Sequence, residues 1–480
     1  AVVHLARGDA PARLVQLATP EMPNVQVNDN PRWALGLSDL PYQPLMSWDG
    51  VYMDSYVVDL QTGQTKPLAR KTRHAPRLSP TGRYVLGFDA LKARWLAWES
   101  ASAQPQALDL TGKIKARFDN IERDVPDLPS PYGVAGWSAQ DDSVLLYDQY
   151  DLWAVTPASG THRNLTQGEG RKAKLEFRVE LLDKEDADAK PLPADRLLLA
   201  ATHEIQRDSG YFQLDLNGGQ GAKPQQLILA PKMVGGLIKA KSADRVVFTQ
   251  QSFTEFPDLW SAASPALAAP QKISQANPQQ QRYHWGTQEL IEYRAANGKT
   301  LRALLAKPEN FDPKKKYPMM VYIYENMTDN RYRHVPPAPA QNINVTRYVS
   351  NGYLVLRPDI TYTTGHPGKS AMGTVLPAIQ QVVKQGYVDD KRIGIQGHSW
   401  GAYQINYLIT QTKLFAAAEA GASMANMVSG YGGIRWGTGL SRAFQYEHGQ
   451  SRMGTTPWAN PQLYVENSPI FAIDKVRTPY

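Results

Sequence analysis

Short apolar runs separated by turn residues fill the chain up to about residue 280. Three stretches resemble one another: LSPTGRYVLGFDALKARWLAW begins at Leu78, WSAQDDSVLLYDQYDLWAV at Trp137 and SADRVVFTQQSFTEFPDLWSA at Ser242. Each has a polar turn, an apolar strand, a short link and a second strand that holds a tryptophan. A related stretch, RLLLAATHEIQRDSGYFQLDL, begins at Arg196. A four-stranded unit that recurs about every 40 to 60 residues is typical of a β-propeller blade, and about five such blades fit here. An irregular all-β domain is the alternative.

The pattern changes after residues 261–282, whose Ala, Pro, Gln and Ser are typical of a linker. A hairpin that turns at Asn297-Gly298 is predicted next, followed by apolar strands in YPMMVYIYE, YLVLRPD and RIGIQ. Helical spacing predicts a helix over residues 370–386, with Pro377 near its first turn or at a kink, and a second helix over AYQINYLITQ.

Alternating strands and helices predict a parallel sheet that is covered on both faces. We therefore expect an all-β domain over residues 1–280 and an α/β domain over residues 281–480. A length of 480 residues agrees with two large domains.

Composition and charge exclude several classes of protein. The 52 basic and 45 acidic residues give a net charge of +7, and the densest basic run is only Lys314–Lys316, so no nucleic-acid-binding arm is expected. The sequence contains no run of about 18 apolar residues, so no membrane-spanning helix is predicted. The chain has no cysteine, which excludes disulfides, thiolate zinc sites and cysteine nucleophiles. No metal or cofactor is expected, because the zinc motif that His203-Glu204 begins has Arg207 in place of its second histidine.

The candidate chemistry lies in residues 392–407, RIGIQGHSWGAYQINY. A GxSxG motif that follows a buried strand and opens a helix is typical of a nucleophilic serine on a tight turn, which makes Ser399 the predicted nucleophile. The neighbouring His398 is not expected to be its base, because adjacent side chains on a sharp turn point apart. The backbone N–H of Trp400 is the expected first donor to the oxyanion. The second donor should follow an early strand, where Tyr324 stands; packing in the core is the alternative role for this side chain.

The β-rich region, followed by YPMMVYIY and then GYVDDKRIGIQGHSWGAYQINYLITQT, resembles the prolyl oligopeptidase family of serine peptidases. The branch that contains dipeptidyl peptidase IV and acylaminoacyl-peptidase is the most similar. The resemblance implies a β-propeller followed by an α/β-hydrolase domain, with Ser399 as the nucleophile of an acyl-enzyme mechanism. The Trp400 N–H and the Tyr324 hydroxyl would form the oxyanion hole. Family members cleave short peptides, and the propeller restricts access to their active site.

The sequence departs from this family in the residues that recognise substrates. Dipeptidyl peptidases hold the amino terminus of the substrate with adjacent glutamates, and this chain contains no Glu-Glu pair. The stretch AEAGASMANMVSGYGG stands where relatives line their S1 pocket. It offers Met424 and the expected substrate-binding residues Met427, Val428 and Tyr431, which make an apolar pocket without a clear shape for proline.

The triad partners of Ser399 are a further departure. α/β-Hydrolases carry Ser, Asp and His in that order, but after Ser399 the only histidine is His448 and the only aspartate, Asp474, follows it. His448 is expected in a loop or at a helix end. We therefore expect that this sequence is a fragment, incomplete at the C-terminus of its hydrolase domain and shortened in its propeller. The triad Asp and His would come from a missing segment or a second chain, and the fragment alone would be inactive.

Two other functions stay open at this point. An esterase could use the same fold and serine, and a non-catalytic protein could bind partners through its propeller face. The expected partner is a peptide substrate, with neither nucleic acid nor membrane, and homodimerisation is left open. The resemblance alone favours a periplasmic or secreted protein, with the cytoplasm as the alternative.

Overall fold

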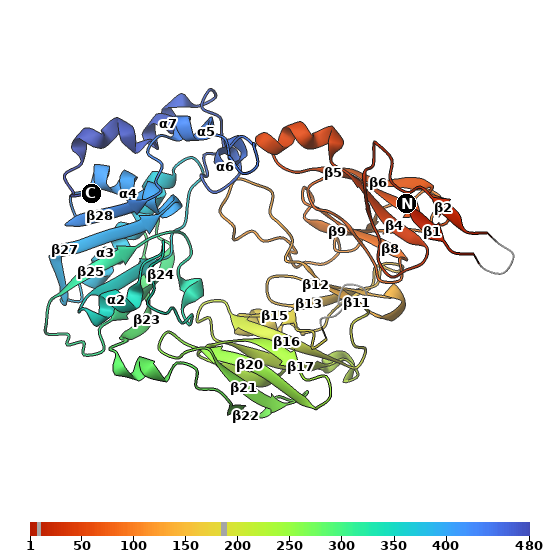
Figure 1. Ribbon diagram of the computed structural model, residues 1–480, viewed down its shortest axis with the longest axis horizontal. Coiled ribbons are helices and arrows are strands. Elements are labelled where there is room, and N and C mark those ends of the chain that lie inside the picture. Colours follow the sequence, from red (N-terminus) through yellow and green to blue (C-terminus); the bar gives the residue numbers. More distant parts are fainter. Residues whose placement is uncertain (7–10, 184–189) are drawn as a thin grey trace. The chain divides into compact units, whose positions relative to one another are not determined.

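The computed structural model describes residues 1–6, 11–183 and 190–480. The chain forms two compact units (Figure 1). The N-terminal unit comprises residues 1–123, 128–205 and 209–229, and the C-terminal unit comprises residues 124–127, 206–208 and 230–480. The short segment Asp124–Asp127 therefore belongs to the unit that carries Ser399, although it stands far from it in the sequence.

Four sheets of four strands each make up most of the N-terminal unit, and in each the strands lie side by side in chain order. A separate pair, β1 (Val2–His4) and β2 (Arg13–Val15), precedes them, and α1 spans Glu169–Ala173. The strands of the four sheets are β3 (Asn24–Gln26), β4 (Trp33–Ser38), β5 (Met53–Asp59) and β6 (Thr65–Thr72); β7 (Arg77–Leu78), β8 (Tyr84–Asp89), β9 (Arg94–Glu99) and β10 (Leu108–Asp109); β11 (Val134–Trp137), β12 (Val144–Tyr147), β13 (Leu152–Val155) and β14 (His162–Asn164); and β15 (Leu175–Val179), β16 (Arg196–His203), β17 (Ser209–Asp215) and β18 (Gln225–Ala230).

A fifth sheet of the same kind lies in the C-terminal unit and contains β19 (Met233–Lys239), β20 (Arg245–Gln251), β21 (Asp258–Ala263) and β22 (Ala268–Lys272). The described residues between positions 24 and 272 thus form five four-stranded sheets, in agreement with the number that the repeat predicted. The repeated stretches are the second and third strands of their sheets. Each repeat tryptophan pairs across these two strands with an apolar residue, in the pairs Phe88–Trp95, Leu146–Trp153 and Phe248–Trp260.

The linker predicted over residues 261–282 is wrong in part, because it contains the end of β21, all of β22 and a 3₁₀ helix over Pro278–Arg282. All five residues of β22 are exposed at the edge of their sheet. An exposed edge strand needs no apolar alternation, so the composition AAPQK gave no strand signal. The domain boundary at residues 280 and 281 stays a prediction.

A six-stranded sheet forms the centre of the C-terminal unit, in the order β23-β24-β26-β25-β27-β28. The hairpin of β23 and β24 turns at Asn297-Gly298 as predicted, and Gly298 has a φ of +81°. The pairs β25–β26, β25–β27 and β27–β28 are parallel, and β24 pairs antiparallel with β26. The strands are β23 (Thr287–Arg294), β24 (Thr300–Lys307), β25 (Tyr317–Tyr322), β26 (Leu354–Pro358), β27 (Val388–His398) and β28 (Ala417–Gly421).

Helices cover both faces of this sheet, as the alternation of strands and helices predicted. Leu354 and Leu356 of β26 pack in the core cluster that includes α3 and α4, whereas Val355 between them packs in the cluster that includes α2. Successive side chains of a strand point to opposite faces, which explains the continuous apolar run in YLVLRPD. The helices are α2 (Val345–Ser350), α3 (Pro367–Val383), α4 (Trp400–Gln411), α5 (Met427–Tyr431), α6 (Ala443–Glu447) and α7 (Pro461–Glu466).

Pro377 lies in the interior of α3, not in its first turn. Proline has no N–H, so the carbonyl of Gly373, four residues earlier, loses its partner within the helix. The backbone N–H of Ala296, in the β23–β24 turn, donates to this carbonyl at 2.8 Å. The hairpin therefore satisfies the acceptor that the proline leaves free, and α3 continues through Pro377.

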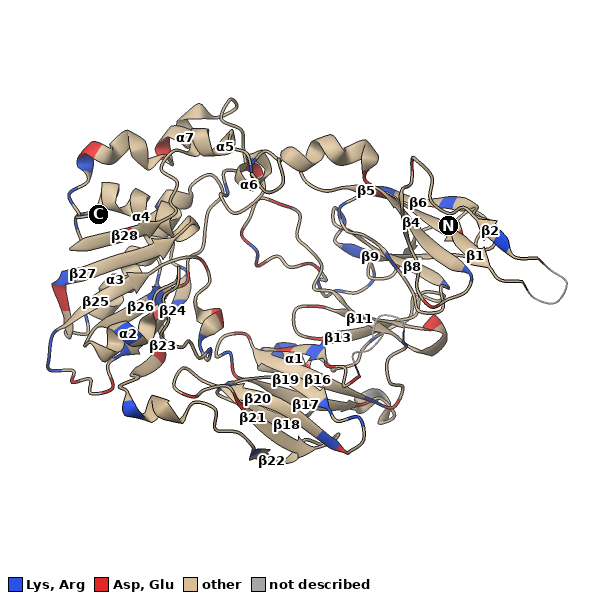
Figure 2. Cartoon of the chain, viewed as in Figure 1, with Lys and Arg blue, Asp and Glu red and all other residues tan. Residues whose placement is uncertain are grey.

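Basic and acidic residues both occur along the two units (Figure 2). Within the described part of the chain, no helix is both long enough and apolar enough to cross a membrane.

Candidate active site

Ser399 occupies the single residue between β27 and α4. Its φ of +54° and ψ of −110° are sparsely populated for a residue with a side chain, and such strain persists only where the surroundings fix it. The Ser399 N–H donates to the Gly421 carbonyl of β28 at 2.8 Å, and the Ser399 carbonyl accepts from the Tyr403 N–H at 3.0 Å. These two bonds hold the backbone of the turn, and Ser399 itself is exposed.

The two glycines of the motif are required by close backbone packing. A Cβ atom at Gly401 would lie 2.2 Å from the carbonyl oxygen of Ile323. A Cβ atom at Gly397 would lie 3.0 Å from the Gly401 carbonyl carbon and 3.1 Å from the same Ile323 oxygen. The strand β25, which leads into Ile323, can approach the turn this closely only because both positions lack a side chain.

Trp400 is the first residue of α4, where backbone N–H groups have no partner within the helix. Its N–H makes no hydrogen bond to any described residue, so it is free to bind an anionic oxygen beside Ser399. The indole of Trp400 is buried, stacks on Tyr403 with ring centroids 4.7 Å apart, and donates from Nε1 to the Tyr362 hydroxyl at 3.1 Å. The donor and its helix are therefore firmly held.

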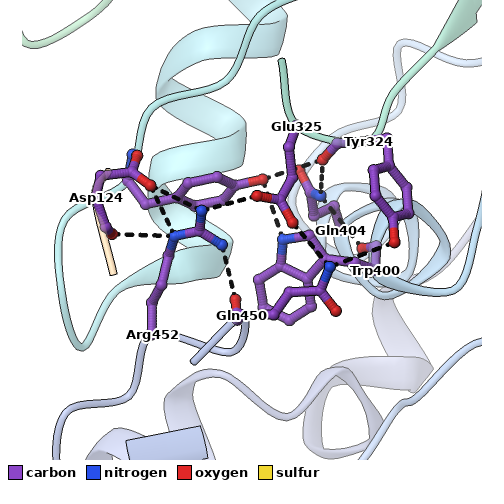
Figure 3. Close-up of polar contacts among 8 residues, drawn as sticks. Asp124, Tyr324, Glu325, Trp400, Gln404, Gln450 and Arg452 are labelled. Atoms are coloured by element: carbon purple, nitrogen blue, oxygen red, sulfur yellow. Dashed lines mark hydrogen bonds and ion pairs between the residues drawn. The ribbon is translucent and has the colours of Figure 1, made fainter. Parts of the chain in front are cut away.

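Tyr324 follows β25 by two residues, and its Cα would be 3.7 Å from a Cβ atom at Gly401. The Tyr324 carbonyl accepts two hydrogen bonds, from Gln404 Nε2 of α4 at 2.7 Å and from the Tyr362 hydroxyl at 3.1 Å (Figure 3). Burial raises the pKa of Tyr362, which keeps its hydroxyl protonated and able to donate. The structure thus holds Tyr324 beside the first turn of α4, at the end of a strand adjacent to the one that carries Ser399.

A buried arginine that sequence reasoning missed, Arg452, contacts Glu325, the residue that follows Tyr324 (Figure 3). The Arg452 side chain is 4% exposed, and its Nη2 lies 2.7 Å from Asp124 Oδ1 and 2.9 Å from Glu325 Oε2. Its Cζ stands 3.9 Å from the centre of the Tyr362 ring, and its backbone adopts a φ of +52°. Burial alone would lower the pKa of Arg452. The electrostatic attraction of Glu325, Tyr362 and Asp124 is the larger effect, and the pKa of Arg452 is raised overall.

Asp124 contacts both Arg452 and the backbone of Tyr362. Its Oδ1 accepts from Arg452, and its Oδ2 accepts from the backbone N–H of Tyr362 at 2.7 Å. No local pattern could predict these contacts, because Asp124 and Arg452 are 328 positions apart.

The three expected substrate-binding residues have different environments. Met427 is completely buried in the core, Val428 is 44% exposed, and Tyr431 is mostly buried with its hydroxyl donating to Glu447 Oε1 at 2.6 Å. The contribution of Val428 and Tyr431 to an S1 pocket stays a prediction. Met427 belongs to the core cluster of the C-terminal unit and has no exposed surface, and its role in substrate binding also stays a prediction.

The described residues include all nine histidines, and none of them is hydrogen-bonded to the Ser399 hydroxyl. His398 precedes the turn at the end of β27. His448 follows the last residue of α6, as expected, and its Nδ1 lies 3.1 Å from the carbonyl oxygen of Pro126. Asp474 lies in a 3₁₀ helix over Pro469–Lys475. After that helix, the Pro479 carbonyl accepts from the Ala418 N–H of β28 at 2.9 Å.

Comparison with known proteins agrees with this geometry. Residues 362–480, which contain Ser399 and Arg452, match the model of the prolyl oligopeptidase family. The uncharacterised peptidase YuxL of Bacillus subtilis is 26% identical over 152 residues, which are 30% of this chain and 23% of that protein. Mouse dipeptidyl peptidase 8 is 28% identical over 152 residues, which are 28% of this chain and 16% of that protein. The chain therefore matches less than a quarter of the length of either relative.

Solved structures extend the likeness to nearly the whole chain at the level of the fold. Porphyromonas gingivalis dipeptidyl peptidase 4 has a TM-score of 0.62 and 14% identity, covering 98% of this chain and 69% of that one. A puromycin-hydrolysing peptidase of Mycobacterium tuberculosis has a TM-score of 0.60 and 13% identity, covering 99% of this chain and 72% of that one. The match over residues 362–480 thus places that segment in the prolyl oligopeptidase family of serine peptidases, and nearly the whole chain shares the fold of the solved peptidase structures.

Proposed function

We propose that this chain carries the nucleophile and the oxyanion hole of a serine peptidase that hydrolyses short peptides through an acyl-enzyme. The observation that carries the proposal is the geometry of Ser399: an exposed side chain on a strained turn, followed by a free backbone N–H at the start of α4. The names of its relatives favour peptide bonds as the substrate over simple esters.

In the proposed reaction, the Ser399 Oγ attacks the carbonyl carbon of the scissile peptide bond, and its proton passes to a general base. The oxygen of the tetrahedral intermediate becomes negative and accepts hydrogen bonds from the Trp400 N–H and the Tyr324 hydroxyl. The base then protonates the leaving amine, the C–N bond breaks, and Ser399 retains the acyl group as an ester. Water hydrolyses this ester by the same steps in reverse order.

No histidine among the described residues is hydrogen-bonded to Ser399, so none of them is assigned as the general base. We propose that a histidine and its aspartate, supplied by residues outside this sequence or by a second chain, complete the triad. The α/β-hydrolase order of Ser, Asp and His supports this assignment, because His448 and Asp474 stand in the reverse order. The five four-stranded sheets would restrict the substrates to short peptides, and a periplasmic or secreted location is part of the proposal.

The test is hydrolysis by the full-length protein that contains this sequence, assayed on a series of short peptides and on simple acyl esters. We expect peptide hydrolysis that is lost in Ser399→Ala and reduced about 10²- to 10³-fold in Tyr324→Phe, the usual loss for one oxyanion donor. Ser350→Ala, at an exposed serine that ends α2, is the matched control and should keep full activity. Hydrolysis of esters without peptides would indicate an esterase, and a folded protein that hydrolyses neither would indicate a binding protein.

A further inference from the structure

Gln450 connects the cluster around Arg452 to the hydroxyl of Tyr324 (Figure 3). Its Nε2 lies 2.8 Å from Glu325 Oε1 and 3.3 Å from the Tyr324 hydroxyl oxygen. Gln450 stands in the loop between α6 and α7, whereas Tyr324 and Glu325 follow β25. The amide of one glutamine thus contacts both the candidate oxyanion donor and the carboxylate next to it in the sequence.

The carboxylate of Glu325 determines which end of this amide faces it. Glu325 Oε2 is paired with Arg452 Nη2 at 2.9 Å, so Glu325 is an ionised group that can only accept hydrogen bonds. Rotating the amide by half a turn would place its oxygen at the 2.8 Å position, against a carboxylate oxygen with no proton between them. The nitrogen of Gln450 must therefore be the atom that faces Glu325 and Tyr324.

This orientation fixes the role of the Tyr324 hydroxyl. An amide nitrogen only donates, so the Tyr324 oxygen accepts from Gln450 and its own proton must point elsewhere. A phenolic proton prefers the plane of the ring, which offers it two directions. The N–H of Gln450 disfavours a proton that points toward it, so the Tyr324 proton takes a direction away from Gln450.

We propose that Gln450 is a positioning residue for catalysis, which turns the Tyr324 hydroxyl proton away from the Arg452 cluster so that it can donate to the oxyanion formed at Ser399. The inference rests on the proposed function, because it assigns the partner that orients one of its two oxyanion donors. Arg452 supports Gln450 in two ways. It pairs with Glu325, and its Nη1 donates to the backbone carbonyl of Gln450 at 2.8 Å.

Two substitutions of Gln450 in the full-length protein separate orientation from packing. Gln450→Met keeps the length of the side chain but removes the donor, and kcat should fall by about 2- to 10-fold with little change in KM, the loss of one neutral hydrogen bond. Gln450→Glu presents an oxygen to Tyr324, which then donates to residue 450 instead of to the oxyanion, so kcat should fall toward the value of Tyr324→Phe. Gln462→Met, at an exposed glutamine of α7, is the matched control.

A double-mutant cycle then tests whether Gln450 acts through Tyr324. In the Tyr324→Phe background, Gln450→Met should change kcat by less than about 2-fold, because the hydroxyl that it orients is already gone. Equal losses from Gln450→Met with and without the Tyr324 hydroxyl would overturn the proposal, since they would show a role in folding or packing alone.

A second readout does not depend on hydrolysis. In protein labelled with ¹³C at the tyrosine Cζ, the Tyr324 signal is the one that Tyr324→Phe removes. A phenol that donates its proton resembles a phenolate more closely, and the Cζ signal then moves downfield. We expect a downfield shift in Gln450→Met and a larger one in Gln450→Glu. An unchanged Cζ signal in both variants overturns the inference even if peptides are cleaved. The expected shifts without any peptide hydrolysis would instead refute the proposed function and leave the orientation of Tyr324 established.

Discussion

Gly401→Ala is the substitution that tests most sharply how the serine turn is built. The new Cβ atom would lie 2.2 Å from the Ile323 carbonyl oxygen, closer than a carbon and an oxygen can approach. Ile323 cannot yield freely, because its N–H donates to the Gln396 carbonyl of β27 at 3.2 Å. Overpacking of this kind costs about 1–3 kcal/mol, and the higher helix propensity of alanine returns at most about 1 kcal/mol. We expect a net loss of about 1–2 kcal/mol.

Gly373→Ala is the matched control, because Gly373 also lies within a helix of the same unit. A Cβ atom there would lie 3.5 Å from the Ala296 Cβ, an ordinary contact, so this change should stabilise α3 by about 0.5–1 kcal/mol. Urea unfolding followed by tryptophan fluorescence would measure both. The same chemical change should move the two midpoints in opposite directions, and a Gly401→Ala protein as stable as Gly373→Ala would refute the packing described for the turn.

Two further substitutions test buried polar groups of the C-terminal unit. Tyr362→Phe removes the acceptor of the Trp400 indole and one donor to the Tyr324 carbonyl, and we expect a loss of about 1–3 kcal/mol in urea unfolding together with reduced peptide hydrolysis. Burial lowers the pKa of Arg357 from its usual range to about 10, and its Nε has no hydrogen-bond partner among the described residues. Between about pH 10 and the usual arginine pKa the unfolded chain binds a proton that the folded chain does not, so stability rises with pH there and the buried charge costs up to about 3 kcal/mol below pH 10. Arg357→Met should therefore be more stable than the parent protein at pH 7, with a difference that shrinks as the pH passes about 10; a difference that is constant with pH would contradict this origin.

Local sequence patterns predicted those parts of the fold that require particular residue types at neighbouring positions. The hairpin at Asn297-Gly298 was predictable because Gly298 supplies the left-handed backbone that its turn requires. The turn at Ser399 was predictable because the close approach of Ile323 leaves no choice but glycine at positions 397 and 401. The strands of the repeated sheets followed from their short apolar runs between turn residues.

The remaining features depend on contacts that no local pattern encodes. Strand β22 is fully exposed at a sheet edge, so its residues carry no apolar periodicity. Pro377 is tolerated within α3 only because the N–H of Ala296 reaches the carbonyl that it leaves free. The pairing of Arg452 with Asp124 joins residues 328 positions apart. The role proposed for Gln450 depends on its contact with Glu325, which is 125 positions away in the sequence.

The central claim is that Ser399 is the nucleophile, and covalent labelling tests it most directly. The full-length protein would be treated with a fluorophosphonate and digested with trypsin, and the mass of the peptide Ile393–Lys413, in which Ser399 is the only serine, would be measured. We predict one phosphonyl group on Ser399, lost in Ser399→Ala and unchanged in Ser350→Ala. An unmodified peptide from the folded, full-length protein, or a modification that persists in Ser399→Ala, would contradict the account.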